Sequence, residues 1–287
     1  MAKLHRFLEE PYKFLKLVVQ DFQKDNGTIV AAAIAFYIFI SLIPLLLLGV
    51  SILGFFLGSP DQAQMIVFGF LEKYSPTLLE KGGAAGIGTV IEDIVKGRGT
   101  IGGIGLVGLL WAGSSAFANL EKAVNIAWNS SIHRGFIKTR LLAIIMLLAV
   151  GVLLLISLGL STLVNIVQNY DVTVFGISPN GIPFIWAFLA YVIPLAAIIA
   201  IFTIMYKVMP NIGVAWNPAL LSGLVGTIFW EVARNGFSWY IGNFANFSAV
   251  YGSLAGLLIL VFWIYYSSLI LILAAEVGAA SRKYTEL

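Results

Sequence analysis

The stretch that decides the fold runs over residues 26–60, NGTIVAAAIAFYIFISLIPLLLLGVSILGFFLGSP, and contains no Asp, Glu, Lys or Arg. A membrane-spanning helix needs about 20 mostly apolar residues, so this stretch is long enough to cross a bilayer. Five further charge-free windows follow, at residues 99–120, 141–170, 172–206, 208–230 and 235–275. The sequence therefore predicts an all-α, polytopic helical membrane protein with six transmembrane helices, near residues 29–57, 101–120, 141–164, 183–208, 214–241 and 250–275.

The composition of the whole chain agrees with this fold class. Only 11% of the 287 residues are charged and 60% are hydrophobic, whereas soluble domains carry about 25% charged residues. The mean hydropathy is +0.95. These values exclude most soluble folds as well as intrinsic disorder, because disordered chains are polar and charged. The chain has no cysteine, which excludes disulfides, zinc–thiolate sites and cysteine nucleophiles.

The distribution of Lys and Arg predicts the orientation. Six spans place both termini on one side, and positively charged residues concentrate on the cytoplasmic side of a membrane. Outside the spans, twelve basic residues fall on the side of the termini, and four fall on the other side, all within residues 58–100. We therefore expect both termini to be cytoplasmic.

The chain is expected to divide into three parts. Residues 1–27 carry too many charges for a signal peptide and are predicted to form a cytoplasmic amphipathic helical segment, in which Pro11 starts a helix. This segment would lie on the membrane surface or pack on the other cytoplasmic loops. Residues 28–280 form the membrane domain, in which 58–100 is an extracytoplasmic loop with two short helices, and residues 281–287 form a cytoplasmic tail.

Prolines and glycines suggest a hypothesis about internal symmetry. Pro44 and Pro194 each lie near the middle of a predicted span, where proline kinks a helix, and both are candidate hinges. Each stands in the tripeptide Ile-Pro-Leu, and the sequence Gly-Leu-Val-Gly occurs at 105–108 and again at 223–226. These matches fit a three-plus-three inverted repeat, the arrangement of many secondary transporters. Short matches among apolar residues also arise by chance.

One predicted span contains a pair of charges. Glu231 and Arg234 lie three residues apart, hence on one helix face, and Asn235 adds a polar group beside them. A charge inside a bilayer costs about 2.5–3.5 kcal/mol on insertion scales and usually faces a bundle interior or a water-filled cavity. These three residues are candidate substrate-binding residues for a headgroup, an ion or a proton. The alternative is an internal ion pair that neutralises itself and fixes the packing of the span.

A second polar cluster is predicted at the inner end of the span near residues 101–120. Asn119, Glu121 and Lys122 are its candidate substrate-binding residues, and Asn125 continues one face with Asn119 and Lys122. The cluster would line a cytoplasmic vestibule or form the hydrated end of a helix. Trp128 lies nearby, as interfacial aromatic residues do at span ends.

The sequence gives no support for catalysis. Its two histidines, His5 and His133, are far apart, and no pair of His or carboxylate residues has metal-ligand spacing. No phosphate-binding loop of the Walker type occurs, so transport driven by ATP is not expected. We therefore expect no catalytic residues, no metal, no cofactor and no enzyme activity.

Three groups of motifs occur in order between residues 31 and 276. The first consists of AAAIAFY at 31–37 and SLIPL at 41–45, and the second of WAGSSAF at 111–117 with Leu120, Glu121, Ala123 and Asn125. The third consists of Trp230, Glu231 and Arg234, followed by Phe244, Ala245, YGSLA at 251–255, Ala275 and Glu276. Their combination resembles the YihY/virulence factor BrkB family. This resemblance implies a bacterial inner-membrane protein with six spans and cytoplasmic termini. Members have carried a ribonuclease BN label, whereas others are linked to virulence or proposed to export lipids or lipid A precursors.

Our first functional hypothesis is a transporter or flippase of an anionic lipid or other amphiphile, not driven by ATP, with membrane lipids as partners. Arg234 and Lys122 would contact the phosphate of a lipid or lipid-linked substrate, and Glu231 would orient Arg234 or carry a proton. The alternative is a non-catalytic envelope scaffold that binds a partner through residues 58–100. A membrane-associated ribonuclease is disfavoured, and no nucleic acid is expected as a partner. The sequence leaves the substrate, a homo-oligomer and an envelope partner open.

Overall fold

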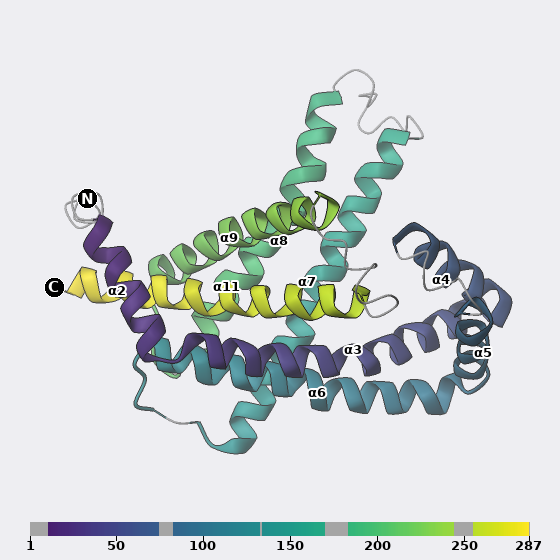
Figure 1. Ribbon diagram of the computed structural model, residues 1–287, viewed down its shortest axis with the longest axis horizontal. Helices are drawn as coiled ribbons and strands as arrows, with labels where there is room; N and C mark the ends of the chain where they lie inside the picture. Colours follow the sequence, from purple (N-terminus) through teal and green to yellow (C-terminus); the bar gives the residue numbers. More distant parts are fainter. Residues whose placement is uncertain (1–10, 75–82, 133, 170–182, 244–254, 287) are drawn as a thin grey trace. The chain divides into compact units, whose positions relative to one another are not determined.

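The computed structural model describes residues 11–74, 83–132, 134–169, 183–243 and 255–286, and the regular elements in these ranges are all α-helices (Figure 1). The charge-free windows of the sequence lie on the long helices. Lipid offers a backbone no hydrogen-bond partner, and a helix satisfies its backbone groups within its own segment. The predicted all-α class is confirmed.

Five helices of the described chain are long and apolar enough to cross a membrane: α3 (Gly27–Leu57), α6 (Arg98–Ala127), α7 (Phe136–Asn169), α8 (Pro183–Val208) and α11 (Ala255–Glu286). Each lies on one of the predicted spans. The sixth predicted span, 214–241, lies on α9 (Trp216–Asn243), which is not among the five. Charged residues such as Glu231 and Arg234 lower its hydropathy. The polytopic membrane architecture is thus confirmed, and the count of six spans stays a prediction.

The described helices belong to two compact units. The first unit contains α7, α8 and the helix α2 (Pro11–Lys24). It also contains the C-terminal parts of α6 and α11 and most of α9. In this unit α7 and α8 run side by side (Figure 1). Large apolar side chains on the outer surface of α7, among them Leu148, Leu155 and Leu158, are exposed. An apolar surface of this kind suits contact with lipid.

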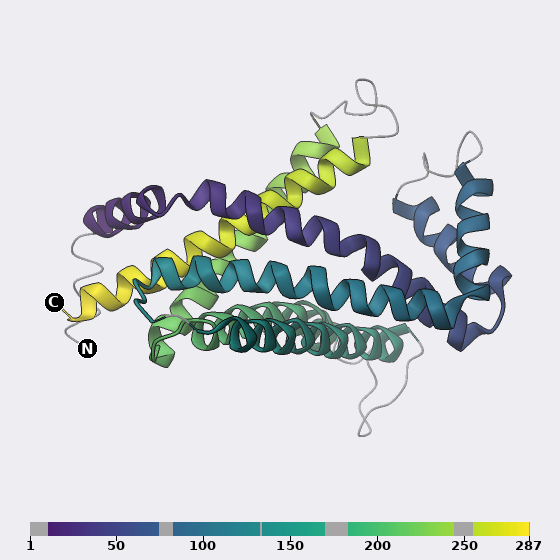
Figure 2. The same ribbon diagram turned by 90° about the horizontal axis from the view of Figure 1, so that it is seen from below.

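The second unit contains most of α3, the first part of α6 and two shorter helices, α4 (Pro60–Tyr74) and α5 (Gly83–Lys96). Figure 2 shows α4 and α5 side by side. Ala63, Ile91 and Val95 form a buried cluster between them, and the Gln64 side chain donates a hydrogen bond of 2.9 Å to the Gly88 carbonyl. The two short helices predicted within residues 58–100 are therefore confirmed.

The helix α2 begins at Pro11, as the sequence predicts, and packs against the end of α11. Val18 forms a buried cluster with Val277 and Ala280 of α11, and Lys283 Nζ lies 2.7 Å from Asp21 Oδ2. The apolar face of α2 thus covers another helix. Of the two arrangements left open by the sequence, packing on the protein agrees with these contacts, although the partner is a helix end and not a loop.

Asp25 follows α2, and we expect its carboxyl to make the docking of α2 sensitive to pH. Burial raises the pKa of the Asp25 carboxyl, and the negative charge of Asp21 raises it further; Lys24, Lys283 and a hydrogen bond with Glu276 act in the opposite direction. A raised pKa means that the docked state binds the proton more tightly than the undocked chain. The contribution of Asp25 to docking is therefore present at low pH and lost as the pH rises through its pKa.

We predict that Asp25→Asn makes the docking of α2 less dependent on pH, because the amide cannot lose a proton. The chain has no native cysteine, so a single cysteine at Val18 reports the docking by its reaction with a maleimide. Val18 is buried and its neighbour Val19 is exposed, so a cysteine at Val19 corrects for the effect of pH on the reagent. Equal pH dependence of the corrected labelling with and without the Asp25→Asn substitution would contradict the prediction.

Glycines bring α6 close to α3 in the second unit. A β-carbon on Gly105 would lie 3.0 Å from the Leu48 backbone nitrogen and 3.1 Å from the Pro44 carbonyl oxygen. A β-carbon on Gly108 would lie 3.2 Å from the ring of Pro44. Small residues allow such close approach of helices in membranes.

Glycines also allow a close approach of α9 to α8 in the first unit. A β-carbon on Gly223 would lie 2.2 Å from Thr203 Oγ1 and 3.0 Å from the Thr203 nitrogen, and one on Gly226 would lie 2.7 Å from the Phe202 ring. Each Gly-Leu-Val-Gly motif thus packs against a proline-containing helix from earlier in the chain, α3 for the first motif and α8 for the second. Pro44 and Pro194 lie inside α3 and α8. The inverted repeat and the hinge role of the prolines stay predictions.

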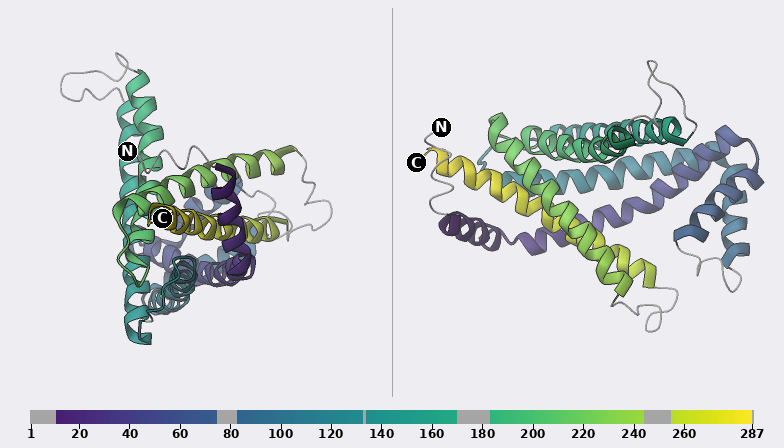
Figure 3. Two further views of the ribbon diagram at one scale, coloured as in Figure 1. Left: turned by 90° about the vertical axis from the view of Figure 1, so that its left-hand side faces the viewer. Right: turned by 90° about the horizontal axis from the view of Figure 1, so that it is seen from above.

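The first part of α9 also crosses the last part of α11 (Figure 3). Gly278 of α11 stands at this crossing, where a β-carbon would lie 1.8 Å from Ser222 Oγ and 3.1 Å from the Pro218 carbonyl oxygen. Here too, the absence of a side chain permits the contact.

We predict that Gly223→Ala destabilises the protein by about 1–3 kcal/mol, the usual cost of forcing extra atoms into a packed site. Gly236 lies on the same helix with open space around its α-carbon, so Gly236→Ala is the matched control. This control should be neutral or stabilising, since Ala favours helix by up to about 1 kcal/mol over Gly. Thermal unfolding in detergent measures both changes, and equal effects would argue against the close α8–α9 contact.

Candidate functional site

The last turns of α6 carry the second predicted polar cluster. Glu121 is buried and Lys122 is exposed, while Asn119 and Asn125 are half-buried. Successive residues of a helix point about 100° apart, so Glu121 faces the protein interior and Lys122 faces outward. Lys122 and Asn125 line one cavity, and Asn119 is not among its described lining residues. The substrate-binding role of these residues stays a prediction.

Arg134 contacts several of the polar groups near the end of α6 and the end of α8. One of its guanidinium nitrogens lies 3.1 Å from Glu121 Oε1, and the same nitrogen donates to the Met209 carbonyl at 2.8 Å. The other terminal nitrogen donates to the Pro210 carbonyl at 3.1 Å. The last carbonyls of a helix have no partner within it and carry partial negative charge. The nitrogen that binds Pro210 also lies 3.4 Å from the carbonyl oxygen of Val208, the last residue of α8. Arg134 therefore compensates the buried Glu121 and binds carbonyls at and just after the end of α8.

Two asparagines complete the junction between α6 and the chain that follows α8. The backbone nitrogen of Asn211 donates to Asn125 Oδ1 at 2.6 Å, and Asn211 Nδ2 donates to the Ile132 carbonyl at 2.7 Å. These bonds connect Asn211, between α8 and α9, to the last turns of α6 and to Ile132, between α6 and α7.

Beside this junction lies a cavity of about 370 Å³. Glu121 and Arg134 compensate each other, so Lys122 is the uncompensated charge among the described residues that line the cavity. Two buried acceptor atoms, Glu121 Oε2 and Asn211 Oδ1, have no hydrogen-bond partner among the described residues. The site therefore combines one cation with acceptors for donor groups of a ligand. The lining residues are Glu121, Lys122, Asn125, Ile126, Ser130, Arg134, Thr139 and Asn211.

The charged pair predicted within α9 is present as an ion pair. Arg234 lies 2.7 Å from Glu231 Oε2, with 51% of the Arg234 side chain and 16% of the Glu231 side chain exposed. Asn235, the next residue, is also exposed. The contact fits both interpretations of this pair, a site that orients Arg234 and an internal pair that neutralises itself. None of the residues that line the Lys122 cavity comes from α9, so the structure does not bring Lys122 and Arg234 to one cavity.

Sequence reasoning missed Arg134 and Asn211 as members of the site. It counted Arg134 only as one of the basic residues that set the orientation, and it did not single out Asn211. Arg134 and its carbonyl partners lie about 75 residues apart in the chain, and spacing carries no signal at that separation. The described residues also contain no group of three or more His, Cys, Asp or Glu placed to hold a metal ion.

The scaffold alternative rests on α4 and α5. These helices leave Met65, Ile66 and Val90 exposed, which provides apolar surface within residues 58–100. Binding of a partner there stays a prediction.

Together the long apolar helices and the polar junction at their ends define a multi-span helical membrane protein. Residues 18–286 match the family model described as "Virulence factor BrkB". The chain therefore belongs to the BrkB family.

Similar proteins carry membrane-protein names for the most part. The chain is 27% identical over 255 residues to a UPF0761 membrane protein of Alteromonas mediterranea, covering 88% of this chain and 82% of the relative. It is 28% identical over 271 residues to a UPF0761 membrane protein of Alkalilimnicola ehrlichii, covering 93% of this chain but 58% of that longer relative.

A further relative has a different name. The chain is 25% identical over 279 residues to the "Putative ribonuclease-like protein YfkH" of Bacillus subtilis, covering 96% of this chain and 97% of the relative. No solved structure matches the chain.

We predict that Arg134→Ala lowers the stability of the protein by about 3–5 kcal/mol, because it leaves the buried Glu121 carboxylate without its cation. The double variant Arg134→Met with Glu121→Gln should recover part of this loss, since it buries no uncompensated charge. Lys138 is exposed in the same segment, and Lys138→Ala is the control. Thermal unfolding of detergent-purified protein ranks the three variants by their stability. A loss in Arg134→Ala no larger than in Lys138→Ala would contradict this role.

Proposed function

We propose that this membrane protein transports or flips an anionic lipid or a similar amphiphile, and that Lys122 binds its phosphate. The observation that carries the proposal is the cavity at the end of α6, where Lys122 is the uncompensated charge. The net charge of its described lining residues is positive because Glu121 and Arg134 neutralise each other. An anionic group suits this charge.

The size and the position of the cavity suit a headgroup. Ligand cavities usually measure about 300–1,000 Å³, and this one measures about 370 Å³. It lies where α6, a helix long and apolar enough to cross the membrane, ends. A headgroup bound there would leave its acyl chains beside the apolar surface of the helices. The unpartnered acceptors of Glu121 and Asn211 would receive hydroxyl or ammonium donors of the same headgroup.

In this proposal the α9 pair forms a second contact along the route. Glu231 holds the Arg234 guanidinium at 2.7 Å, and the exposed part of Arg234 would meet the phosphate of a moving lipid. Pro44 and Pro194 would permit α3 and α8 to bend. With no phosphate-binding loop for ATP in the sequence, a gradient or simple equilibration would drive the movement.

The name of the Bacillus subtilis relative suggests a second function, a ribonuclease. We consider it less well supported than lipid transport. Metal-dependent nucleases gather carboxylates around their ions, and the described residues contain no such group. We therefore propose a role without catalysis, in which the cytoplasmic face of an inner membrane is the expected place of the Lys122 cavity.

We predict that Lys122→Gln and Arg234→Ala each slow lipid movement roughly tenfold, because each removes a charge-assisted hydrogen bond to phosphate. The assay uses liposomes that contain the purified protein and a trace of fluorescent phosphatidylglycerol, with dithionite added outside to bleach only the label that reaches the outer leaflet. Lys138→Gln is the control, as an exposed cation that lines no described cavity.

Two results would overturn the proposal. One is wild-type protein that moves the labelled lipid no faster than protein-free liposomes do. The other is an unchanged rate in both Lys122→Gln and Arg234→Ala at normal levels of reconstitution. Cleavage of RNA by the purified protein would instead favour the nuclease interpretation.

A further inference from the structure

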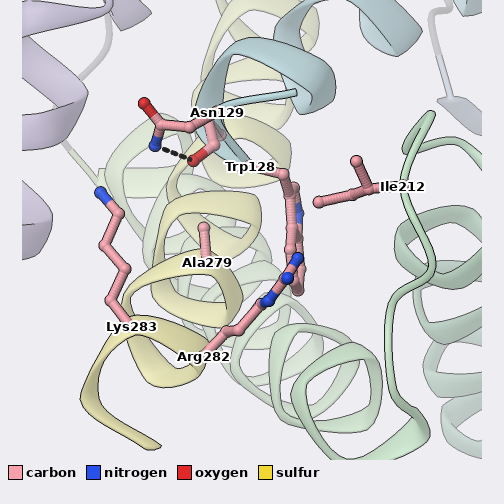
Figure 4. Close-up of a pocket in the computed structure, with 7 residues that line it drawn as sticks. Trp128, Asn129, Ile212, Ala279, Arg282 and Lys283 are labelled. Atoms are coloured by element: carbon pink, nitrogen blue, oxygen red, sulfur yellow. Dashed lines mark hydrogen bonds between the residues drawn. The ribbon is translucent and has the colours of Figure 1, made fainter. Parts of the chain in front are cut away.

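A second cavity, of about 260 Å³, lies between the end of α6 and the last turns of α11 (Figure 4). It shares no lining residue with the Lys122 cavity. Its lining residues are Ala127, Trp128, Asn129, Ile212, Ala279, Arg282 and Lys283.

The charged residues among those that line this cavity are both cations, Arg282 and Lys283. They differ in direction: in Figure 4 Arg282 extends toward the ring of Trp128, and Lys283 extends to the other side of Ala279. Lys283 is engaged there by Asp21 of α2 at 2.7 Å. Arg282 is the cation directed at Trp128 in Figure 4. No acid is among the described residues that line this cavity, in contrast to the Lys122 cavity with its buried Glu121.

Trp128 supplies an unused hydrogen-bond donor in the wall. The residue is only 5% exposed, and its ring packs so closely on α11 that a β-carbon on Gly278 would lie 3.1 Å from the ring. Its indole nitrogen, Nε1, is buried without a hydrogen-bond partner among the described residues. Indole N–H can only donate, and a buried polar group without a partner is costly. An acceptor bound at this wall would remove that cost.

The remaining wall contains Asn129, whose side-chain nitrogen donates to the Ala127 carbonyl at 3.4 Å, and the apolar residues Ala127, Ile212 and Ala279. A guanidinium, an indole N–H and an apolar wall together suit a phosphate joined to a hydrocarbon part. Arginine binds phosphate through its fixed fork of donors, and tryptophan occurs in membrane proteins at the level of the headgroups.

We propose that this cavity binds a phosphate group, held by Arg282 and by the indole N–H of Trp128. The site is distinct from the transport route proposed above and does not depend on it. Two sources could supply the phosphate: the headgroup of a membrane lipid, or free phosphate from the aqueous phase. The experiment is designed to separate them.

The test measures binding by native mass spectrometry of the detergent-purified chain in the Lys122→Gln background, which removes the cation of the other cavity. The probes are dioleoylphosphatidylglycerol, dioleoylglycerol, which has the same acyl chains but no phosphate, and inorganic phosphate. We expect retention of phosphatidylglycerol and not of dioleoylglycerol. Arg282→Gln should weaken this binding roughly tenfold, as the loss of a charge-assisted hydrogen bond does. Trp128→Phe keeps an aromatic ring and removes only the N–H donor, and it should weaken the binding by a smaller factor.

The controls decide between outcomes. Lys138→Gln removes an exposed cation outside the cavity and should leave binding unchanged, while thermal unfolding without added lipid checks that Trp128→Phe is folded. Retention of phosphatidylglycerol that inorganic phosphate does not displace identifies the lipid as the source, and displacement by inorganic phosphate identifies the free ion. Equal binding with and without the Arg282→Gln substitution, an equal loss in Lys138→Gln, or equal retention of dioleoylglycerol would each overturn the proposal.

Discussion

Lipid hydrocarbon contains no partner for a peptide N–H or C=O, and the rest of the structure depends on that constraint. Within the bilayer each backbone group must bond inside its own helix, and the long helices do this over uninterrupted apolar stretches. The constraint ends where the helices end, because the last carbonyls have no partner within the helix. This protein meets that need with Arg134, whose guanidinium donates to carbonyls at the end of α8 and to a buried Glu121. Among the described residues, the polar contacts around Arg134 therefore lie where helices stop, whereas the Glu231–Arg234 pair lies within α9.

Two cavities at these helix ends differ in chemistry although both involve the end of α6. The cavity beside Lys122 contains a compensated ion pair and unpartnered acceptors. The cavity beside Trp128 contains cations and an unpartnered donor. An acceptor-rich site and a donor-rich site select different groups of a ligand. Membership of the BrkB family places both in a membrane protein. Both cavities contain cations that suit a phosphate, and the acceptors of one and the indole donor of the other would select different groups beside that phosphate.

The sequence predicted the features that depend on local composition and missed those that depend on distant contacts. Charge-free windows located the long helices because the requirement for apolar residues acts on each helix separately. Pro11 marked the start of α2 because its fixed backbone angle suits a first helical turn. The sequence could not show that Lys283 pairs with Asp21, since 262 residues separate them. The sequence likewise indicated only an interfacial position for Trp128. The packing of its ring on Gly278 of α11 is a contact between distant parts of the chain, which only the folded structure shows.

The glycine contacts between α8 and α9 have a mechanical consequence. Gly223 and Gly226 leave no clearance against Thr203 and Phe202, and the rings of Phe202 and Trp230 meet at 6.3 Å between centroids. Helices in such close contact cannot slide along each other without first moving apart. The two helices are therefore expected to move together as one rigid body. A bend of α8 would then displace Trp230 and the neighbouring Glu231–Arg234 ion pair as well.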